Sequence, residues 1–117
     1  MQAQVQAPGR QPAMRLTTRW GFAVDDPSAE QLAAALAELD ADDREHPDCW
    51  LADAFGWTIT VARSGRVVLE NAETGQGPWH IERLARNEAL GLWQLLEQAD
   101  WARIRQFGWR EGYGDAA

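Results

Sequence analysis

The sequence predicts an α+β domain in which an antiparallel sheet of about four strands is flanked by an N-terminal and a C-terminal helix (α-β-β-β-β-α). Two amphipathic helical patterns lie toward the ends of the chain, and four short segments rich in β-branched and aromatic residues lie between them. A length of 117 residues, 45% of them apolar, suits one domain with one core. We therefore expect a flexible tail over residues 1–14 and a single α+β domain over residues 15–117.

The N-terminal segment carries few structural signals. Residues 1–14 are rich in glutamine, alanine and proline without periodicity, so we expect a tail, with Met14 as an alternative natural start. They contain no continuous apolar run typical of a secretory signal, no segment of the chain is long enough to span a membrane, and a single cysteine excludes an internal disulfide. A cytoplasmic location follows as the expectation. Residues 15–24 contain β-formers and favour a short edge strand.

The first helix is predicted over residues 29–42. Ser28 and Gln31 form an S-x-x-Q capping box at its start. Its C-terminal end is rich in acidic residues, which is unfavourable to the helix dipole, and a violated local rule often marks a functional segment. The stripe expected to be buried consists of Leu32, Leu36 and Leu39.

A run of β signals follows this helix. Residues 57–62 alternate between apolar residues and threonines, and Ser64-Gly65 is typical of a tight hairpin turn. Short loops between the segments favour an antiparallel meander. The four expected strands are Cys49–Ala52, Trp57–Ala62, Val67–Leu69 and Trp79–Arg83.

The second helix shows the strongest periodicity in the chain. Asn87 is expected to be its N-cap, and Asp100 to cap one further short turn. Residues 107–114 form an aromatic, glycine-rich tail. The apolar stripe of the second helix consists of Ala89, Leu92, Trp93 and Leu96.

Charge is distributed unevenly along the chain. The net charge is −7, but residues 25–53 alone carry ten acidic residues against one arginine, a local −9. From residue 54 onward, seven arginines nearly balance eight acidic residues. A concentrated negative field repels nucleic acid and anionic membranes and attracts basic partners. We therefore expect a protein partner, with no binding to nucleic acid or membrane.

Motifs for catalysis, cofactors and metals are weak. The glycine-rich phosphate-binding loops do not occur, and the acidic segment 40–45 lacks the fifth-position oxygen ligand and sixth-position glycine of an EF-hand. His46-x-x-Cys49 is at best half of a zinc site. Cys49 and His80 can in principle form a thiolate–imidazole pair, but acidic neighbours suppress the thiolate, so we interpret Cys49 as a core residue. We expect no catalytic site, no cofactor and no metal.

Seven tryptophans are too many for a core of this size to hide. Aromatic side chains beside acidic residues are typical of a protein interface with buried anchors and a polar rim, although indoles also stack on sugars. Trp50, Trp57 and Trp93 lie on expected core faces. The remaining candidates for surface exposure are Trp79, Trp101, Trp109 and Tyr113.

The order of these segments resembles a known class of proteins. A capped acidic helix is followed by HPDCWLADAFGWTITVARSGRVVLEN, by GPWHI, and by the helix NEALGLWQLLEQAD with a tryptophan after it. Over residues 25–113 this layout resembles small immunity proteins of bacterial polymorphic toxin systems, the antidotes to contact-dependent or type VI-secreted toxins. The resemblance implies a cytoplasmic, non-enzymatic protein that binds a cognate toxin and blocks its active site.

A toxin with a basic substrate groove, such as a nuclease or deaminase, would complement the acidic segment. Two alternatives stay open: a small ligand- or carbohydrate-binding domain, and a subunit of a larger protein assembly. The expected partner-binding residues are Asp40, Asp42, Asp43, Glu45, Asp48, Trp79, Trp109 and Tyr113.

Overall fold

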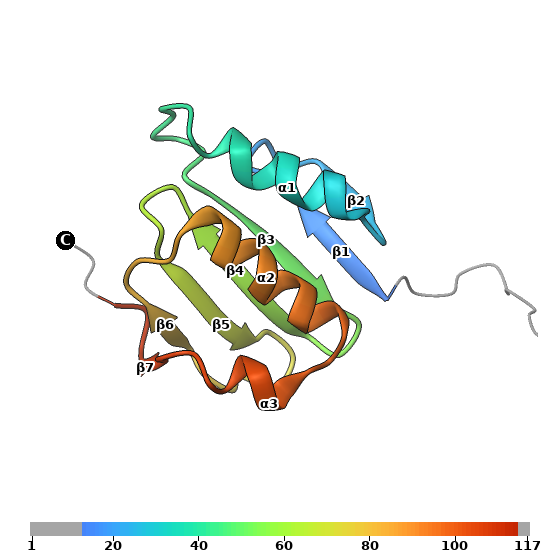
Figure 1. Cartoon of the computed structure of the whole chain (residues 1–117), viewed down its shortest axis with the longest axis vertical. Coiled ribbons are helices and arrows are strands. Elements are labelled where there is room, and N and C mark those ends of the chain that lie inside the picture. The colour runs from blue at the N-terminus through green and yellow to red at the C-terminus, as the bar shows by residue number, and fades with distance from the viewer. Residues whose placement is uncertain (1–12, 115–117) are drawn as a thin grey trace, which may run out of the picture.

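The computed structural model describes residues 13–114, which form an antiparallel sheet with its helices packed on one face (Figure 1). The α+β class is confirmed, but the sheet has seven strands instead of about four, and there are three helices instead of two. The strand order is β2-β1-β3-β4-β5-β6-β7. The strands are β1 (Met14–Thr17), β2 (Ala23–Asp25), β3 (Asp48–Asp53), β4 (Trp57–Ala62), β5 (Val67–Asn71), β6 (Trp79–Ile81) and β7 (Arg110–Glu111), and the helices are α1 (Ala29–Glu38), α2 (Arg86–Glu97) and α3 (Trp101–Ile104).

The prediction of a single edge strand over residues 15–24 is wrong, because this segment forms a hairpin of two strands. Thr18 donates its backbone N–H to the carbonyl of Phe22, and Gly21 supplies the positive φ of +88° that the turn requires. Strand β1 lies between β2 and β3, and it begins at the buried Met14, which belongs to the domain and not to a tail. Residues 1–12 of the expected tail lie outside the described residues.

The helix boundaries differ from expectation at two ends. The capping box of α1 is confirmed, but α1 ends at Glu38, four residues before the expected Asp42. Helix α2 begins at Arg86, with Ala85 and not Asn87 as its N-cap, because Glu88 reaches back to accept the Ala85 N–H at 3.1 Å.

The C-terminal segment is more regular than expected. Asp100 caps α3 by accepting the backbone N–H of Arg103, which confirms the short turn. The segment 107–114, expected to be a tail, contains β7, which pairs with β6 and extends the sheet. Short strands of this kind lack the alternating pattern by which a strand is recognised in sequence.

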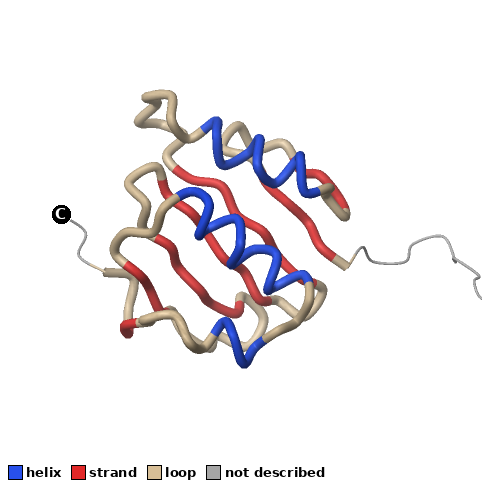
Figure 2. The backbone as a smooth tube through the Cα atoms, viewed as in Figure 1, coloured by secondary structure: helices blue, strands red, loops and turns tan. Residues whose placement is uncertain are grey.

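One apolar core lies between the sheet and the helices, and Figure 2 shows α1 and α2 crossing the same face of the sheet. The side chain of Trp93 is fully buried at its centre, and its indole N–H donates to the Ile59 carbonyl at 3.0 Å. Within residues 13–114, the opposite face of the sheet carries no helix (Figure 1). Its central row runs across six strands through Thr17, Trp50, Thr60, Val68, His80 and Arg110.

Candidate functional site

A buried arginine organises the acidic loop between α1 and β3. Arg19, from the β1–β2 turn, is 3% exposed, and its guanidinium donates to backbone carbonyls on four residues. These carbonyls belong to a helix end and the loop after it, so one cation compensates both the dipole of α1 and the acidic residues there. The acceptors are the carbonyl oxygens of Glu38, Ala41, Asp43 and His46.

Exposed aromatic side chains lie beside this loop. Trp20 is 43% exposed; its ring centroid lies 5.1 Å from that of His46 and 5.1 Å from the guanidinium carbon of Arg19. Phe22, in the same turn, is 70% exposed. Trp50, which the sequence placed in the core, is exposed on the helix-free face instead, where it pairs with Thr17. Successive side chains of a strand point to opposite faces of the sheet. Because the neighbours of Trp50, Cys49 and Leu51, face the core, Trp50 faces away from it.

The five acidic residues expected to bind a partner all lie in this region. Asp42 and Glu45 are exposed, and the exposed Asp40 forms an ion pair with Arg86 at 3.3 Å. Asp48 is partly buried at the start of β3, and burial raises the pKa of its carboxyl. We call these acidic residues, Asp43 included, together with Trp20 and Phe22 the acidic surface.

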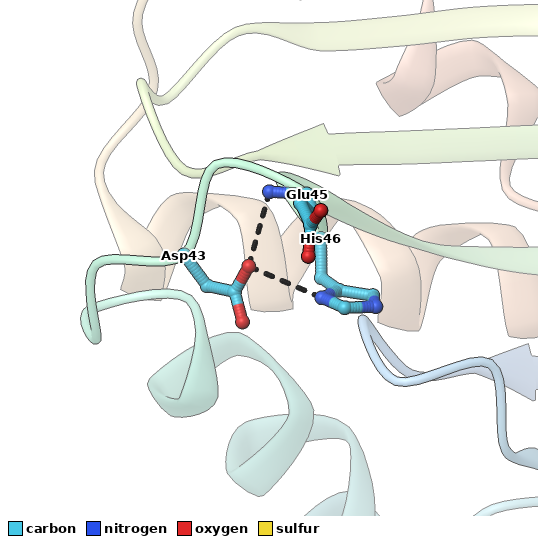
Figure 3. Close-up of side chains that lie close together, drawn as sticks. All are labelled: Asp43, Glu45 and His46. Carbon is cyan, nitrogen blue, oxygen red and sulfur yellow. Dashed lines mark hydrogen bonds and ion pairs between the residues drawn. The ribbon is translucent and has the colours of Figure 1, made fainter.

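Asp43, Glu45 and His46 form a compact cluster within the acidic surface (Figure 3). The Asp43 carboxylate accepts hydrogen bonds from the His46 ring at 3.1 Å and from the Glu45 backbone N–H at 3.0 Å. The hydrogen bond from His46 lowers the pKa of Asp43. Their potential ligand atoms lie within 4.8 Å of one another, close enough to share a metal ion, but the internal hydrogen bonds already account for this geometry.

The structure separates Cys49 from both histidines considered as its partners. Cys49 is fully buried on the core face of β3, and burial, reinforced by Asp48, raises the pKa of its thiol to about 12. His80 lies on the opposite face, on β6, with β4 and β5 between them, about 14 Å away at ordinary strand spacing. His46 bonds to Asp43. Neither the thiolate–imidazole pair nor the zinc half-site is formed.

Tyr113 lies on the helix-free face, away from the acidic surface. Its hydroxyl donates to the Glu70 carboxylate at 2.6 Å, which raises the pKa of Tyr113. The adjacent Gly112 carbonyl lies 2.8 Å from Nδ1 of His80, and a side chain at Gly114 would meet both His80 and Arg66 at 3.0 Å. Gly112 to Gly114 therefore lie tightly over the end of the sheet formed by β5 and β6.

Trp79 and Trp109 meet in a different place, a pocket of about 460 Å³ at the foot of the sheet beside α3. We call it the tryptophan pocket. Trp57 lies on the core face of β4, as predicted, and is half-buried in the pocket wall. Trp101, which was expected at the surface, is half-buried in the same wall. The lining residues are Trp57, Leu69, Gln76, Trp79, Trp101, Ile104, Arg105 and Trp109.

The eight residues expected to bind one partner thus occupy three places: the acidic surface, the tryptophan pocket and the helix-free face. Sequence reasoning missed Trp20 and Phe22 in the acidic surface, and it missed the buried Arg19 that holds the loop of this surface. The signal for Arg19 was present in principle, because an acidic helix end requires a cation from elsewhere in the chain.

Comparison with protein-family models, with curated proteins and with solved structures found no match. Across residues 13–114, none of the three helices has the length and apolar content needed to cross a lipid bilayer.

Proposed function

We propose that this chain is a protein-binding domain whose acidic surface captures a basic partner, in the role of an immunity protein that neutralises a bacterial toxin. One observation carries the proposal: a buried guanidinium holds the acidic loop by hydrogen bonds to four backbone carbonyls. An acidic segment that is fixed before binding loses less conformational entropy on association than a flexible one.

The composition of the acidic surface supports a protein partner. Trp20 and Phe22 supply exposed aromatic area, the kind of side chain enriched at binding hot spots, and the acidic residues supply a charged rim. The field of these acids would steer a basic groove toward the loop. A nuclease or deaminase toxin, whose substrate is anionic, has such a groove, and an acidic inhibitor seated there would exclude the substrate.

The proposal is tested by charge reversal at the exposed acids. The triple variant Asp40→Lys, Asp42→Lys and Glu45→Lys reverses the exposed acids, and the ion pair lost between Asp40 and Arg86 is solvent-exposed and contributes little to stability. Asp43, which bonds to His46 and Glu45, and the partly buried Asp48 stay in place. The partner is first captured from the native host with the wild-type chain as bait. We expect the variant to associate roughly 10- to 100-fold more slowly with it at low ionic strength, and the difference to shrink as salt is added.

A matched control separates local charge from net charge. The triple variant Glu73→Lys, Glu97→Lys and Glu111→Lys changes the net charge equally, at exposed positions away from the acidic surface. It should associate nearly as fast as the wild type. Equal rates for the wild type and the acidic-surface variant at low salt, or equal slowing by both variants, would refute this role for the surface.

A further inference from the structure

A second feature of the molecule lies apart from the acidic surface. The tryptophan pocket is lined by residues of α3. Helix α3 lies at the opposite end of the molecule from the acidic loop that follows α1 (Figure 1). The pocket volume of about 460 Å³ falls within the range of roughly 300–1,000 Å³ typical of small-molecule sites. The proposed function makes no use of a concave apolar site at this position.

The aromatic walls of the pocket are held in defined positions. The ring centroids of Trp57 and Trp101 lie 4.8 Å apart and tilted by 55°, and Trp79 stacks on Trp57 at 6.4 Å. Trp109 is fixed by a hydrogen bond of 2.7 Å from its indole N–H to the Ile104 carbonyl. These separations are those of interacting aromatic rings, so the walls support one another.

The polar groups of the pocket are few. Within residues 13–114, the indole N–H groups of Trp57, Trp79 and Trp101 donate no hydrogen bond and are not fully buried, so they remain available to a ligand. Gln76 adds an amide. Arg105 is the single charged residue in the lining, and no carboxylate accompanies it.

This charge balance discriminates between classes of ligand. Aromatic walls suit a quaternary ammonium ion through cation–π attraction, but Arg105 would repel such a cation and no carboxylate offsets it. A neutral sugar would bring several hydroxyls into a lining that offers few polar partners, which costs desolvation energy. A flat ring with one negative group matches both the indoles and the guanidinium.

We propose that the tryptophan pocket binds a small aryl carboxylate, with its ring packed against the indoles of the wall and its carboxylate on Arg105. The site is independent of the acidic surface, so either proposal can fail without the other.

The test uses the ¹⁵N-labelled full chain and three probes that share one ring: phenylacetate, the neutral phenylacetamide and the cationic phenethylamine. We expect phenylacetate to shift the indole N–H resonances of Trp57, Trp79 and Trp101 saturably. The resonance of Trp93 should stay in place, because its N–H is buried and bonded to Ile59. The neutral probe should bind about tenfold more weakly, since it lacks the charge-assisted bond to Arg105, and the cation more weakly still.

Two arginines of α3 and its C-cap provide a matched pair of variants. Arg105→Gln removes the charge at the pocket and should weaken phenylacetate binding about tenfold while the neutral probe binds as before. Arg103→Gln is the control, because Arg103 is 71% exposed, lies outside the lining and pairs with Asp100. Both side chains are exposed, so both variants should fold.

Four results would each overturn the proposal: no saturable shift with phenylacetate, equal affinity for the three probes, equal weakening by the two variants, and tighter binding of glucuronate than of phenylacetate. The last result would assign the pocket to acidic sugars instead. Acetate, which has the charge without the ring, should not bind.

Discussion

At the residue scale, a buried guanidinium replaces the basic side chain that usually closes a helix C-terminus from within the helix. The last turn of α1 contains no basic residue, and Arg19 reaches the carbonyl of its last residue, Glu38, from the β1–β2 turn. The same guanidinium then fixes the loop as far as His46. These contacts are made to the backbone, so the side chains of Asp42 and Glu45 remain exposed and can face a partner.

Replacement of Arg19 by methionine should therefore destabilise the fold and loosen the loop. Four carbonyls lose a charged donor, so we expect a loss of about 3 kcal/mol in the free energy of unfolding, measured in urea. Backbone amides of residues 40–47 should also exchange faster with deuterium. Arg15→Met removes only an exposed ion pair with Asp25 and serves as the control. Equal effects of the two substitutions would contradict the role given to Arg19.

Asp48 should stabilise the fold at acid pH and weaken it at neutral pH. Burial raises the pKa of its carboxyl in the folded state, so its contribution is favourable below the pKa of the unfolded chain, near 4, and is lost as the pH rises through the folded value. Asp48→Asn is therefore expected to raise the Tm at pH 7, with a gain that disappears at pH 3.5. A thermal unfolding series over this range, with the exposed Asp42→Asn as control, measures it; a gain independent of pH would count against burial as the cause.

At the scale of the elements, the loop between β5 and β6 builds one wall of the tryptophan pocket. Gly77 has a φ of +86°, and a Cβ there would lie 3.0 Å from both the Leu69 carbonyl and the Trp79 ring. Only glycine allows Trp79 to pack this closely on the strand. Gly75, two residues earlier, also has a positive φ, of +79°, but its Cβ would meet nothing within 4 Å.

Substitutions at these two glycines distinguish the cost of backbone strain from the cost of steric contact. Gly75→Ala should cost about 1 kcal/mol, from the positive φ alone, whereas Gly77→Ala adds the contact with Trp79 and should cost roughly 2–3 kcal/mol. Urea unfolding gives both values, and the indole resonance of Trp79 should move only in the second variant. Equal losses of unfolding free energy in the two variants would mean that the β5–β6 loop adjusts to the added methyl group and that Gly77 is not required to form the pocket wall.

The longer elements could be predicted from the sequence, because periodicity over ten residues or an alternating strand depends on the residues themselves. The S-x-x-Q box of α1, the face of β4 and the buried stripe of α2 are of this kind. Strand β6, which also has three residues, was predicted because the apolar Trp79 and Ile81 alternate with His80. Elements β2 and β7 could not be predicted, because they lack such alternation and exist only through their pairing with a neighbour. The end of α1 could not be predicted for the same reason, since it depends on Arg19, 19 residues away in sequence.

The candidate sites also combine features that can be read from the sequence with features that arise only in the folded structure. The concentration of acids in one loop is a sequence property, and the five residues do lie in one region. Which aromatic residues accompany them is a tertiary property. Trp79 and Trp109 come from β6 and from the segment after α3, and they meet in the pocket instead, while Trp20 reaches the loop from the first hairpin.

At the scale of the whole molecule, one core serves two separate surfaces. Trp93 and the leucines of α1 and α2 fill the layer between helices and sheet, and Ile104 extends the same core to α3. The acidic loop and the tryptophan pocket are attached at opposite ends of this layer (Figure 1). Substitutions in one should therefore add to substitutions in the other without coupling.

The two edge strands of the sheet have a consequence for how the protein behaves at high concentration. A sheet that ends in a long, flat strand offers unpaired backbone groups to another chain and invites polymerisation into fibres. Here the edge strands are β2, which has three residues, ends at Asp25 and is followed by Asp26, and β7, with only Arg110 and Glu111. Short, charged edge strands offer few unpaired backbone groups to a strand of another chain. We therefore expect this seven-stranded sheet, although one of its faces is free of helices, to stay monodisperse, whereas a longer edge strand would nucleate amyloid.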